Sequence, residues 1–406
     1  MTSASGSWSG LVARISIVTA TAIVTAGVAA AGTWETLGYL EDSRYGHTTT
    51  LLASGEVFVV AGATDYSDLS STEIFNPIDG TLRRGQPLTT ARRHHTATML
   101  RDGRILVCGG WSSVAAAALS SCELWNPATE LWEKTTSMQW QRAWHTATVL
   151  DDGSVLVAGG HTGSGYILPG ETFNPQTLEW TATDNTIMYP RHHHTASLLA
   201  NGEVLLVGGS NAPGDPSLRD STPVAGVEIY NPGTRRFRTT ASLSPGRQNH
   251  SATVLPDGRV VVAGGWDGTH ITRSCRLYDP SGSSWSTISD LTTWREQHSA
   301  VLLANGEVLV IGGRTYRIFD TDDTCENSSE VYNPAADTWT STANASMQGR
   351  GRATATMLTD GTVLVVGGEC FGYPQPLAQR YNHDQRAWYS ASAPFVDDYL
   401  FRHTAT

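Results

Sequence analysis

Short apolar runs alternate with polar turns along the chain, and the same arrangement recurs at intervals of about fifty residues. In one copy, apolar and polar residues alternate after His194, and residues 204–209 then read VLLVGG. Both stretches have the length and the aliphatic content of β-strands. Asn201-Gly202 stands between them, and both residues accept the positive φ of a tight primed turn. Each copy therefore predicts a β-hairpin.

A turn pair of this kind stands in every copy. The other pairs are Ser54-Gly55, Asp102-Gly103, Asp152-Gly153, Asp257-Gly258, Asn305-Gly306 and Asp360-Gly361. Each glycine follows, by eight residues, a repeat position held by His47, His95, His145, His194, His250, His298 and, in the last copy, Ala353. This spacing predicts the same hairpin in successive units along the whole chain.

Two aromatic residues mark the second half of each copy. Tyr230 precedes Asn231-Pro232, and Phe237 follows six residues after the asparagine. The same pattern is found in Trp125-Asn126-Pro127 with Trp132, Phe173-Asn174-Pro175 with Trp180, Tyr278-Asp279-Pro280 with Trp285, and Tyr332-Asn333-Pro334 with Trp339. The end copies are weaker, because Leu82 follows Phe75-Asn76-Pro77, and His383 replaces the proline after Tyr381-Asn382, although Trp388 is kept. These features predict a third and a fourth strand joined by a turn.

Four antiparallel strands in a repeat of this length predict a propeller blade rather than a helical solenoid. The second strand ends in a glycine pair, the third carries an aromatic residue and the fourth a tryptophan. In these marks the chain resembles the kelch-repeat β-propellers, which include the central domain of galactose oxidase. The glycine pairs are Gly109-Gly110, Gly159-Gly160, Gly208-Gly209, Gly264-Gly265, Gly312-Gly313 and Gly367-Gly368, with Ala61-Gly62 as a degenerate copy. The resemblance implies an all-β fold for nearly all of the chain after residue 32, and it leaves the function open, because such propellers serve as binding platforms, enzymes and structural modules.

The two ends of the chain bear on the number of blades. Trp34-Glu35-Thr36 resembles a fourth strand with no blade before it, and residues 402–406 resemble a first strand with no blade after it. A ring usually closes by combining strands from both ends in one blade, which removes an exposed edge. Seven complete repeats lie between these two end segments. We expect seven four-stranded blades, with the end segments as spare strands that compete for a place in the ring or remain unpaired; the alternative is an eight-bladed ring whose last blade is truncated.

An uncharged segment precedes the repeats. Arg14 is followed by residues 15–31, which are rich in Ala, Val, Ile and Thr and end in Ala29-Ala30-Ala31. Small residues at this point suit cleavage by a signal peptidase. We expect residues 1–31 to be a signal peptide, residues 32–406 to form the propeller, and the protein to be secreted or periplasmic. The alternative is a protein anchored in a membrane by residues 15–31.

Composition narrows the classes of partner. The net charge is −11, the pI is about 5.6, and Lys134 is the only lysine. A basic surface is needed to neutralise phosphates, so nucleic acid is not an expected partner. No second domain is visible, and we expect a monomer.

The sequence has five cysteines, and their number and spacing do not indicate a disulfide framework. Cys108 ends a second strand and Cys122 enters the third strand of the same blade. Cys325 and Cys370 lie in equivalent loops of two successive blades. In an exported protein both pairs can form disulfides, which leaves Cys275 free. The alternative is that Cys108 and Cys275 are small core residues. No CxxC motif occurs, so no zinc site is indicated.

A candidate site lies at one mouth of the central channel. In a propeller, the loops from strand four to strand one and from strand two to strand three share a face. Residues just before the repeat histidine and just after the glycine pair should therefore converge there. The candidates for ligand binding are Arg93, His94, Trp111, Trp144, His161, His192, Trp266 and Arg314. Aromatic rings beside such polar groups suit a sugar or a peptide.

Each feature also has a structural interpretation. The repeat histidine and an arginine three residues before it recur in nearly every blade, so we interpret both as framework that ties adjacent blades together. The arginines are Arg44, Arg92, Arg142, Arg191, Arg247, Arg295 and Arg350. Trp111 and Trp266 can equally pack under their own loops. On a strand, His193 faces away from His192 and His194, so this run cannot supply three metal ligands.

Resemblance to galactose oxidase implies a copper site that includes a Tyr-His neighbour pair. No Tyr-His dipeptide occurs in this chain. We therefore expect a binding module for a carbohydrate or a partner protein, with no metal, no cofactor and no catalytic residue assigned. The alternative is a sugar-active enzyme, galactose-oxidase-like or sialic-acid-mutarotase-like, that uses the same mouth.

Overall fold

The computed structural model describes residues 33–211, 222–316, 323–342 and 349–383. The chain divides into two compact units, Met1–Ala30 and Ala31–Thr406, and all described residues belong to the second. Residues 1–31, Trp388 and residues 402–406 lie outside the described part. Among the described residues no helix is long and apolar enough to span a bilayer.

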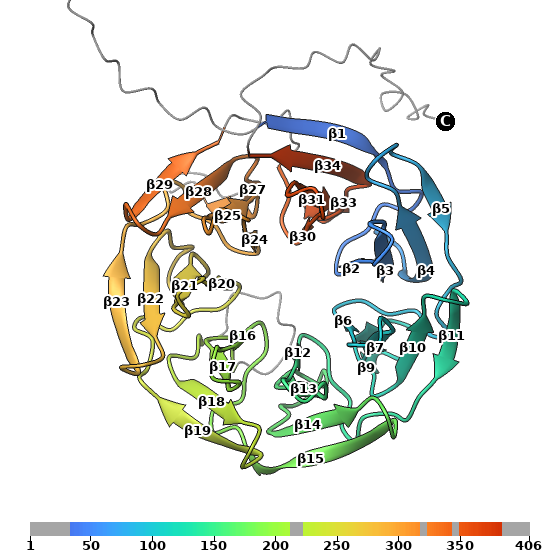
Figure 1. Cartoon of the computed structure of the whole chain (residues 1–406), viewed down its shortest axis with the longest axis horizontal. Coiled ribbons are helices and arrows are strands. Elements are labelled where there is room, and N and C mark those ends of the chain that lie inside the picture. The colour runs from blue at the N-terminus through green and yellow to red at the C-terminus, as the bar shows by residue number, and fades with distance from the viewer. Residues whose placement is uncertain (1–32, 212–221, 317–322, 343–348, 384–406) are drawn as a thin grey trace, which may run out of the picture. The chain divides into compact units, whose positions relative to one another are not determined.

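Seven antiparallel four-stranded sheets form a closed ring (Figure 1), which confirms the predicted seven-bladed, all-β propeller. The first strands, nearest the axis, are β2 (Thr48–Leu51), β6 (Thr96–Met99), β12 (Thr146–Val149), β16 (Thr195–Leu198), β20 (Ser251–Val254), β24 (Ser299–Leu302) and β30 (Thr354–Met357). The second strands are β3 (Val57–Ala63), β7 (Ile105–Cys108), β13 (Val155–Ala158), β17 (Val204–Val207), β21 (Val260–Ala263), β25 (Val308–Ile311) and β31 (Val363–Val366). We number the blades one to seven in the order of their first strands.

The third strands carry the first of the two aromatic landmarks. They are β4 (Asp68–Phe75), β10 (Cys122–Asn126), β14 (Pro169–Asn174), β18 (Val227–Asn231), β22 (Cys275–Asp279), β28 (Ser329–Asn333) and β34 (Leu377–Asn382). The outermost strands are β5 (Leu82–Arg84), β11 (Leu131–Lys134), β15 (Glu179–Thr186), β19 (Arg236–Thr240), β23 (Ser284–Ile288), β29 (Thr338–Ser341) and, in blade seven, β1 (Thr33–Tyr39).

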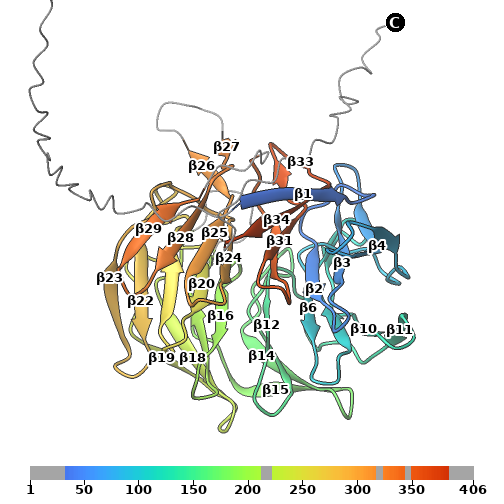
Figure 2. The ribbon, with the colours of Figure 1, turned by 45° about the horizontal axis from the view of Figure 1, so that its top comes forward.

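Three short hairpins extend from the connections between second and third strands. They are β8 (Trp111–Ser112) with β9 (Ala117–Ala118), β26 (Arg314–Tyr316) with β27 (Asp323–Cys325), and β32 (Glu369–Cys370) with β33 (Tyr373–Pro374). Figure 2 shows β26, β27 and β33 at the same end of the ring. We call this end the mouth face.

The predicted hairpins are present, but their turns differ from the expected two-residue primed turn. In blade four, the Gly202 N–H donates to the Leu199 carbonyl at 2.9 Å, and the Leu199 N–H donates to the Glu203 carbonyl at 2.8 Å. Gly202 has φ of +81°, whereas Asn201 is not among the residues with positive φ. The loop thus has three residues, with only its glycine in the left-handed region.

Strand β1 closes the ring. It pairs with β34 in a register that sets Trp34 opposite Tyr381, as Trp339 stands opposite Tyr332 in blade six. The ring centroids are 5.1 Å apart in the closing blade and 5.0 Å apart in blade six. The N-terminal strand therefore takes the place of the fourth strand in the last blade, and it is not the spare strand that the sequence suggested.

Adjacent blades bury their apolar faces against each other. One cluster contains Leu205 and Ile229 of blade four together with Val260, Val262 and Tyr278 of blade five. A cluster of the same kind joins blade one to blade seven through Val57, Phe75, Leu364 and Val366. Each junction between blades is in this way a small hydrophobic core.

A backbone hydrogen bond crosses every junction. The second glycine of each pair donates to the carbonyl of the framework arginine in the next blade, at 2.8–3.0 Å. The bonds run from Gly62 to Arg92, Gly110 to Arg142, Gly160 to Arg191, Gly209 to Arg247, Gly265 to Arg295, Gly313 to Arg350 and Gly368 to Arg44. A Cβ at Gly209 would lie 2.7 Å from the His192 carbonyl oxygen, and φ there is +97°, so glycine is required.

The repeat histidines form a second set of links between blades. Each Nε2 lies 2.8–3.1 Å from a hydroxyl in the preceding blade. The pairs are His47 with Thr354, His95 with Thr48, His145 with Thr96, His194 with Thr146, His250 with Thr195, and His298 with Ser251. Ala353 breaks the series, and there the Ser299 hydroxyl donates to the Ala353 carbonyl.

The framework arginines act mainly within their own blades, which corrects the expectation that their side chains tie blades together. Arg295 is fully buried and donates to the Gly312 carbonyl at 2.7 Å and to the Glu330 carboxylate at 2.6 Å. Arg44, Arg92, Arg142 and Arg191 pair in the same way with a glutamate of the third strand. A buried charge of this kind is tolerated because it is paired and hydrogen-bonded.

The buried histidines predict that the protein loses stability in acid. Burial, followed by nearby arginines, lowers the pKa of His47, His250 and His298 from 6.5 to about 3. Between these values the unfolded chain binds more protons than the fold does. The stabilisation is therefore complete above pH 6.5 and decreases as the pH falls toward 3. One such histidine adds a slope of about 1.4 kcal/mol per pH unit to the free energy of unfolding.

The variant His250→Gln isolates this effect, because glutamine can bond to Thr195 but does not titrate. Chemical denaturation between pH 7.5 and pH 4 should give the variant a shallower dependence on pH than the wild type. Equal slopes in the two proteins would contradict the assignment.

Candidate functional site

Seven residues surround the channel at the mouth face, one from each blade, directly before the repeat position. They are Gly46, His94, Trp144, His193, Asn249, Gln297 and Arg352, and we call them the inner ring. All seven are partly exposed, and all have φ between +53° and +62°. For the six residues other than glycine this conformation costs about 1–2 kcal/mol each. Such a cost is accepted only where the surrounding structure fixes the backbone.

A series of six backbone hydrogen bonds supports the inner ring. Each member after Gly46 donates its N–H to the carbonyl of the member before it, from His94 to Gly46 at 2.8 Å through to Arg352 to Gln297 at 2.9 Å. Four further bonds, 2.9–3.4 Å long, complete the series: Trp144 to His94, His193 to Trp144, Asn249 to His193, and Gln297 to Asn249. Each of these amides donates to the preceding blade, so the side chains are held in fixed order around the channel.

A second layer lies beside the inner ring. The residue two places before each repeat position forms an isolated β-bridge with the residue that follows the glycine pair. The bridges are Tyr45 to Ala63, Arg93 to Trp111, Ala143 to His161, His192 to Ser210, Gln248 to Trp266, Glu296 to Arg314, and Gly351 to Glu369. These bridges bring together the two groups of loop residues that the sequence placed at the mouth.

One half of the mouth is aromatic. Trp144 stacks on His94 at 4.8 Å between centroids, and His193 lies 5.7 Å from Trp144 on its other side. Tyr45 extends the row, 6.1 Å from His94, and Trp111 lies 6.0 Å from Trp144. This aromatic wall spans blades one to four and offers flat apolar area.

The imidazoles of this wall are neutral near pH 7. Burial, then the charges of Arg352 and Arg93, holds the pKa of His94 well below 6.5. Burial, then His192 and Arg352, does the same for His193. The aromatic wall therefore presents uncharged rings to a ligand.

The other half of the mouth is polar. Glu369 is buried, and its carboxylate forms ion pairs with the guanidinium groups of Arg314 and Arg352, each with an N–O distance of 3.0 Å. Asn249 donates to Glu296 at 3.2 Å. The Gln297 side-chain oxygen is buried without a hydrogen-bond partner among the described residues. The Arg352 guanidinium also lies 6.0 Å from the Tyr45 ring, so it joins the polar half to the aromatic half.

The sequence-predicted residues divide between the surface of the mouth and the layer beneath it. His94 and Trp144 belong to the inner ring, and Arg314 belongs to the polar half. Arg93 pairs with Asp68 and donates to Ser113 at 2.8 Å. Trp111 is partly covered, because a Cβ at Gly163 of the next blade would lie 2.6 Å from its ring.

Three predicted residues are buried beneath the mouth. His161 and His192 have no exposed surface, and Trp266 is 9 % exposed. Each stands in the bridging layer, and the His161 ring lies 5.5 Å from the His192 ring of the next blade. The inner-ring residues His193, Asn249, Gln297 and Arg352 were not among the eight candidates. Their place directly before the repeat position, which the sequence already assigned to the mouth, identifies them.

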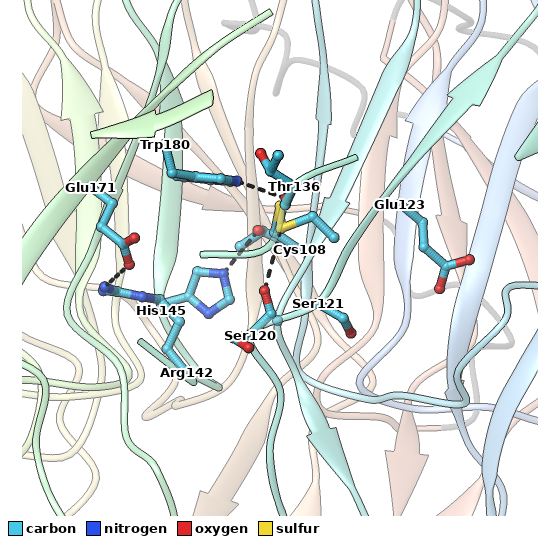
Figure 3. Close-up of a disulfide and its surroundings, with 12 residues drawn as sticks. Cys108, Ser120, Ser121, Glu123, Thr136, Arg142, His145, Glu171 and Trp180 are labelled. Atoms are coloured by element: carbon cyan, nitrogen blue, oxygen red, sulfur yellow. Dashed lines mark hydrogen bonds and ion pairs between the residues drawn. A yellow bond between two sulfur atoms is a disulfide. The ribbon is translucent and has the colours of Figure 1, made fainter. Parts of the chain in front are cut away.

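Both cysteine pairs considered from the sequence are joined. Cys108 and Cys122 connect β7 to β10 within blade two, with 4.3 Å between Cα atoms. Figure 3 shows Cys108 beside Ser120, with the Arg142–Glu171 pair and His145 of the next blade nearby. Cys325 and Cys370 connect blade six to blade seven, with 5.7 Å between Cα atoms. Cys275 is buried and free, and burial raises its pKa to about 12, which makes it unreactive.

The described residues contain no preformed metal centre. In this part of the chain, no three His, Cys, Asp or Glu side chains are grouped so that they could bind one metal ion. A surface hollow at the opposite end of the ring is lined by Asp257, Asn305, Glu307 and Asn333. Its carboxylates already bind neighbours, since Asp257 accepts from Arg259 at 2.8 Å and Glu307 accepts from Asn333 at 2.8 Å. The mouth is therefore the better candidate site.

Comparison with known proteins agrees with this architecture. A model described as the KLHDC2/KLHL20/DRC7 Kelch-repeats domain matches residues 145–368, and a Kelch motif matches residues 92–139. No curated protein matches the chain.

Two solved structures have a similar fold. One is a fungal alcohol oxidase of the AA5 family in complex with copper, with a TM-score of 0.69 and 16 % identity over 87 % of this chain and 76 % of that one. The other is YjhT, with a TM-score of 0.56 and 15 % identity over 75 % of this chain and 98 % of that one. At such identities the likeness shows the fold alone.

The difference in burial predicts different effects for two tryptophans. Trp266→Ala should lower the free energy of unfolding by about 3–5 kcal/mol, because it leaves a cavity beneath the mouth. Trp144→Ala should cost clearly less, since its ring is partly exposed. Chemical denaturation of both variants measures this order, and an unchanged stability of Trp266→Ala would contradict the structural role.

Proposed function

The chain belongs to the kelch-repeat family of β-propellers, and from this premise we propose that it is a monomeric, non-catalytic binding module that docks a partner protein through the mouth face. The observation that carries the proposal is the distribution of exposed apolar side chains. Kelch propellers provide binding or scaffold modules as well as enzyme-like domains, so the residues of this face must decide between them.

Large exposed apolar residues are concentrated at the mouth face. Among the described residues, those in its connections are Tyr66, Val114, Leu168, Met188, Trp294, Phe371 and Tyr373. At the opposite end, Ile78 stands in a turn and Leu131 begins β11 directly after one. Tyr39 is the last residue of β1. Tyr66 and Val114 are 95 % and 93 % exposed. Apolar side chains gathered on one face favour a contact with another protein.

Three adjacent blades carry four of the five most exposed residues in the mouth-face connections, the fifth being Met188. Phe371 and Tyr373 belong to blade seven, Tyr66 to blade one and Val114 to blade two. The aromatic wall begins on the same arc, with Tyr45 and His94. A partner that covers the rim can therefore place one planar side chain on Trp144, in the desolvated centre where hot-spot residues are found.

A carbohydrate is the second candidate ligand, and a specific observation favours it. The stacked rings of Trp144 and His94 stand across the mouth from the amides of Asn249 and Gln297. A sugar ring needs this combination, because its carbon face packs on an aromatic ring while its hydroxyls bond to polar groups. The unpartnered oxygen of Gln297 can accept a hydroxyl.

Matched variants at the two ends of the ring test the binding face. Affinity capture with the purified protein, followed by quantitative mass spectrometry, should recover a partner that Trp144→Ala and Phe371→Ser each lose by about tenfold or more. Ile78→Ser is the control, because it removes an exposed apolar residue from the opposite end. A glycan array with the same variants distinguishes a sugar ligand. Recovery that is equal in all variants would contradict the proposal.

We also propose that the protein is exported. Ala29-Ala30-Ala31 provides a cleavage site, and two disulfides suit an oxidising compartment. Cleavage after Ala31 would leave β1 intact, since that strand begins at Thr33.

N-terminal sequencing of the protein from its natural source should find Gly32 as the first residue, in the periplasmic or secreted fraction. An intact N-terminus in the membrane fraction would support the anchor instead. An intact N-terminus in a reducing, cytosolic fraction would contradict export.

A further inference from the structure

The junction between blades six and seven lacks the histidine link that is present at the other six. At the neighbouring junction, His298 bonds to Ser251 at 2.8 Å, and a Cβ at Gly264 would lie 2.9 Å from the His298 ring. At the junction of blades six and seven the repeat residue is Ala353, and no imidazole lies beside Gly312. The Ser299 hydroxyl donates to the Ala353 carbonyl there instead. Compared with the other junctions, this one therefore lacks one imidazole and the packing of its ring.

A disulfide crosses this same junction. Cys325 lies in β27, above blade six, and Cys370 lies in β32, above blade seven. The other disulfide, Cys108–Cys122, stays within one blade. The one covalent bond between blades in the described part of the chain therefore stands where the histidine link is missing.

The disulfide also borders the polar half of the mouth. In the hairpin β26–β27, Cys325 is the cross-strand partner of Arg314. Cys370 directly follows Glu369, which receives Arg314 from blade six and Arg352 from blade seven, each at 3.0 Å. Any movement of β27 relative to β32 must therefore change the distances within this group of three charges.

We propose that the Cys325–Cys370 disulfide is a reducible lock, which replaces the missing imidazole link and holds Arg314, Glu369 and Arg352 in position at the mouth. The lock does not depend on which ligand the mouth binds. Without it the ring stays closed, because the Gly313 N–H still donates to the Arg350 carbonyl and the Arg352 N–H to the Gln297 carbonyl. The polar half of the mouth becomes mobile, while the aromatic half does not.

Reduction by a dithiol releases the lock in a balanced step. A thiolate of the reagent attacks one sulfur of the disulfide, and its second thiol displaces the other cysteine. Two electrons break the bond between the cysteines, two thiols form on the protein, and the reagent becomes a cyclic disulfide. A reducing environment therefore converts the polar half of the mouth from an ordered to a mobile state.

Hydrogen exchange measured by mass spectrometry tests the lock on the full chain. The comparison includes the wild type, the wild type with dithiothreitol, Cys325→Ser/Cys370→Ser, and Cys108→Ser/Cys122→Ser as the matched control. Peptides that contain the amides of Gly313, Glu326 and Glu369 should exchange about tenfold faster when Cys325–Cys370 is absent or reduced. They should not change in the control, and the peptide containing Gly110 should keep its rate in Cys325→Ser/Cys370→Ser.

Reactivity at Arg352 is a second readout. Phenylglyoxal modifies accessible guanidinium groups, and the extent at Arg352 can be followed by peptide mass spectrometry. It should rise several-fold in Cys325→Ser/Cys370→Ser and stay unchanged in the control. Unchanged exchange and unchanged reactivity, in protein shown to lack this disulfide, would overturn the proposal. Equal acceleration in all blades would also overturn it, because that result indicates general destabilisation.

A rescue variant tests the replacement directly. Ala353→His, introduced into Cys325→Ser/Cys370→Ser, restores the repeat histidine between Gly312 and Ser299. By analogy with His298 and Ser251, the new imidazole can bond to the Ser299 hydroxyl. Exchange at Gly313 and Glu326 should return to within about threefold of the wild-type rate. If a natively folded rescue variant exchanges as fast as its parent, the disulfide does not stand in for the histidine.

Discussion

A four-stranded blade cannot bury both of its faces by itself, and this constraint determines the rest of the structure. Each face must pack on a neighbour, so the blades form a ring in which every junction is a hydrophobic core. The backbone hydrogen bond from the second glycine to the next arginine fixes the distance between blades. Because this bond uses no side chain, residues beside it are free to differ from blade to blade.

In each repeat, the residue that links the blades and the residue that faces the channel are adjacent in the sequence. The histidine is buried and bonds to the preceding blade, whereas the residue directly before it reaches the channel. The same backbone path thus carries a constant residue for packing and a variable one for binding. Six histidines have nearly the same contacts, but the inner ring ranges from Trp144 to Arg352. The mouth is asymmetric although the ring is regular.

Much of the fold could be predicted from the sequence, because its marks are tied to backbone geometry. Gly209 is needed for its φ and its close contact, and the aromatic pairs stand in register across strands. The site was harder to predict. His192 and His193 are adjacent, yet one is fully buried and the other reaches the channel. Alternation predicts that the two side chains face opposite sides, but it does not predict which of them faces the channel. The positive φ of His193 also cannot be predicted from its residue type. The role of β1 was also missed, because pairing across the whole chain leaves no local signal.

The pairing of β1 with β34 has a consequence for how the molecule is assembled. Thr36 and Gln379 are partners, although 343 residues separate them along the chain. Strand β1 is synthesised before the last blade, with which it pairs. The growing polypeptide therefore carries an unpaired strand edge through most of its synthesis. Contacts between such distant segments are slow to form. The ring therefore closes late, when strands from the two ends of the propeller pair. If only the closed ring binds its ligand, binding becomes possible at this one step.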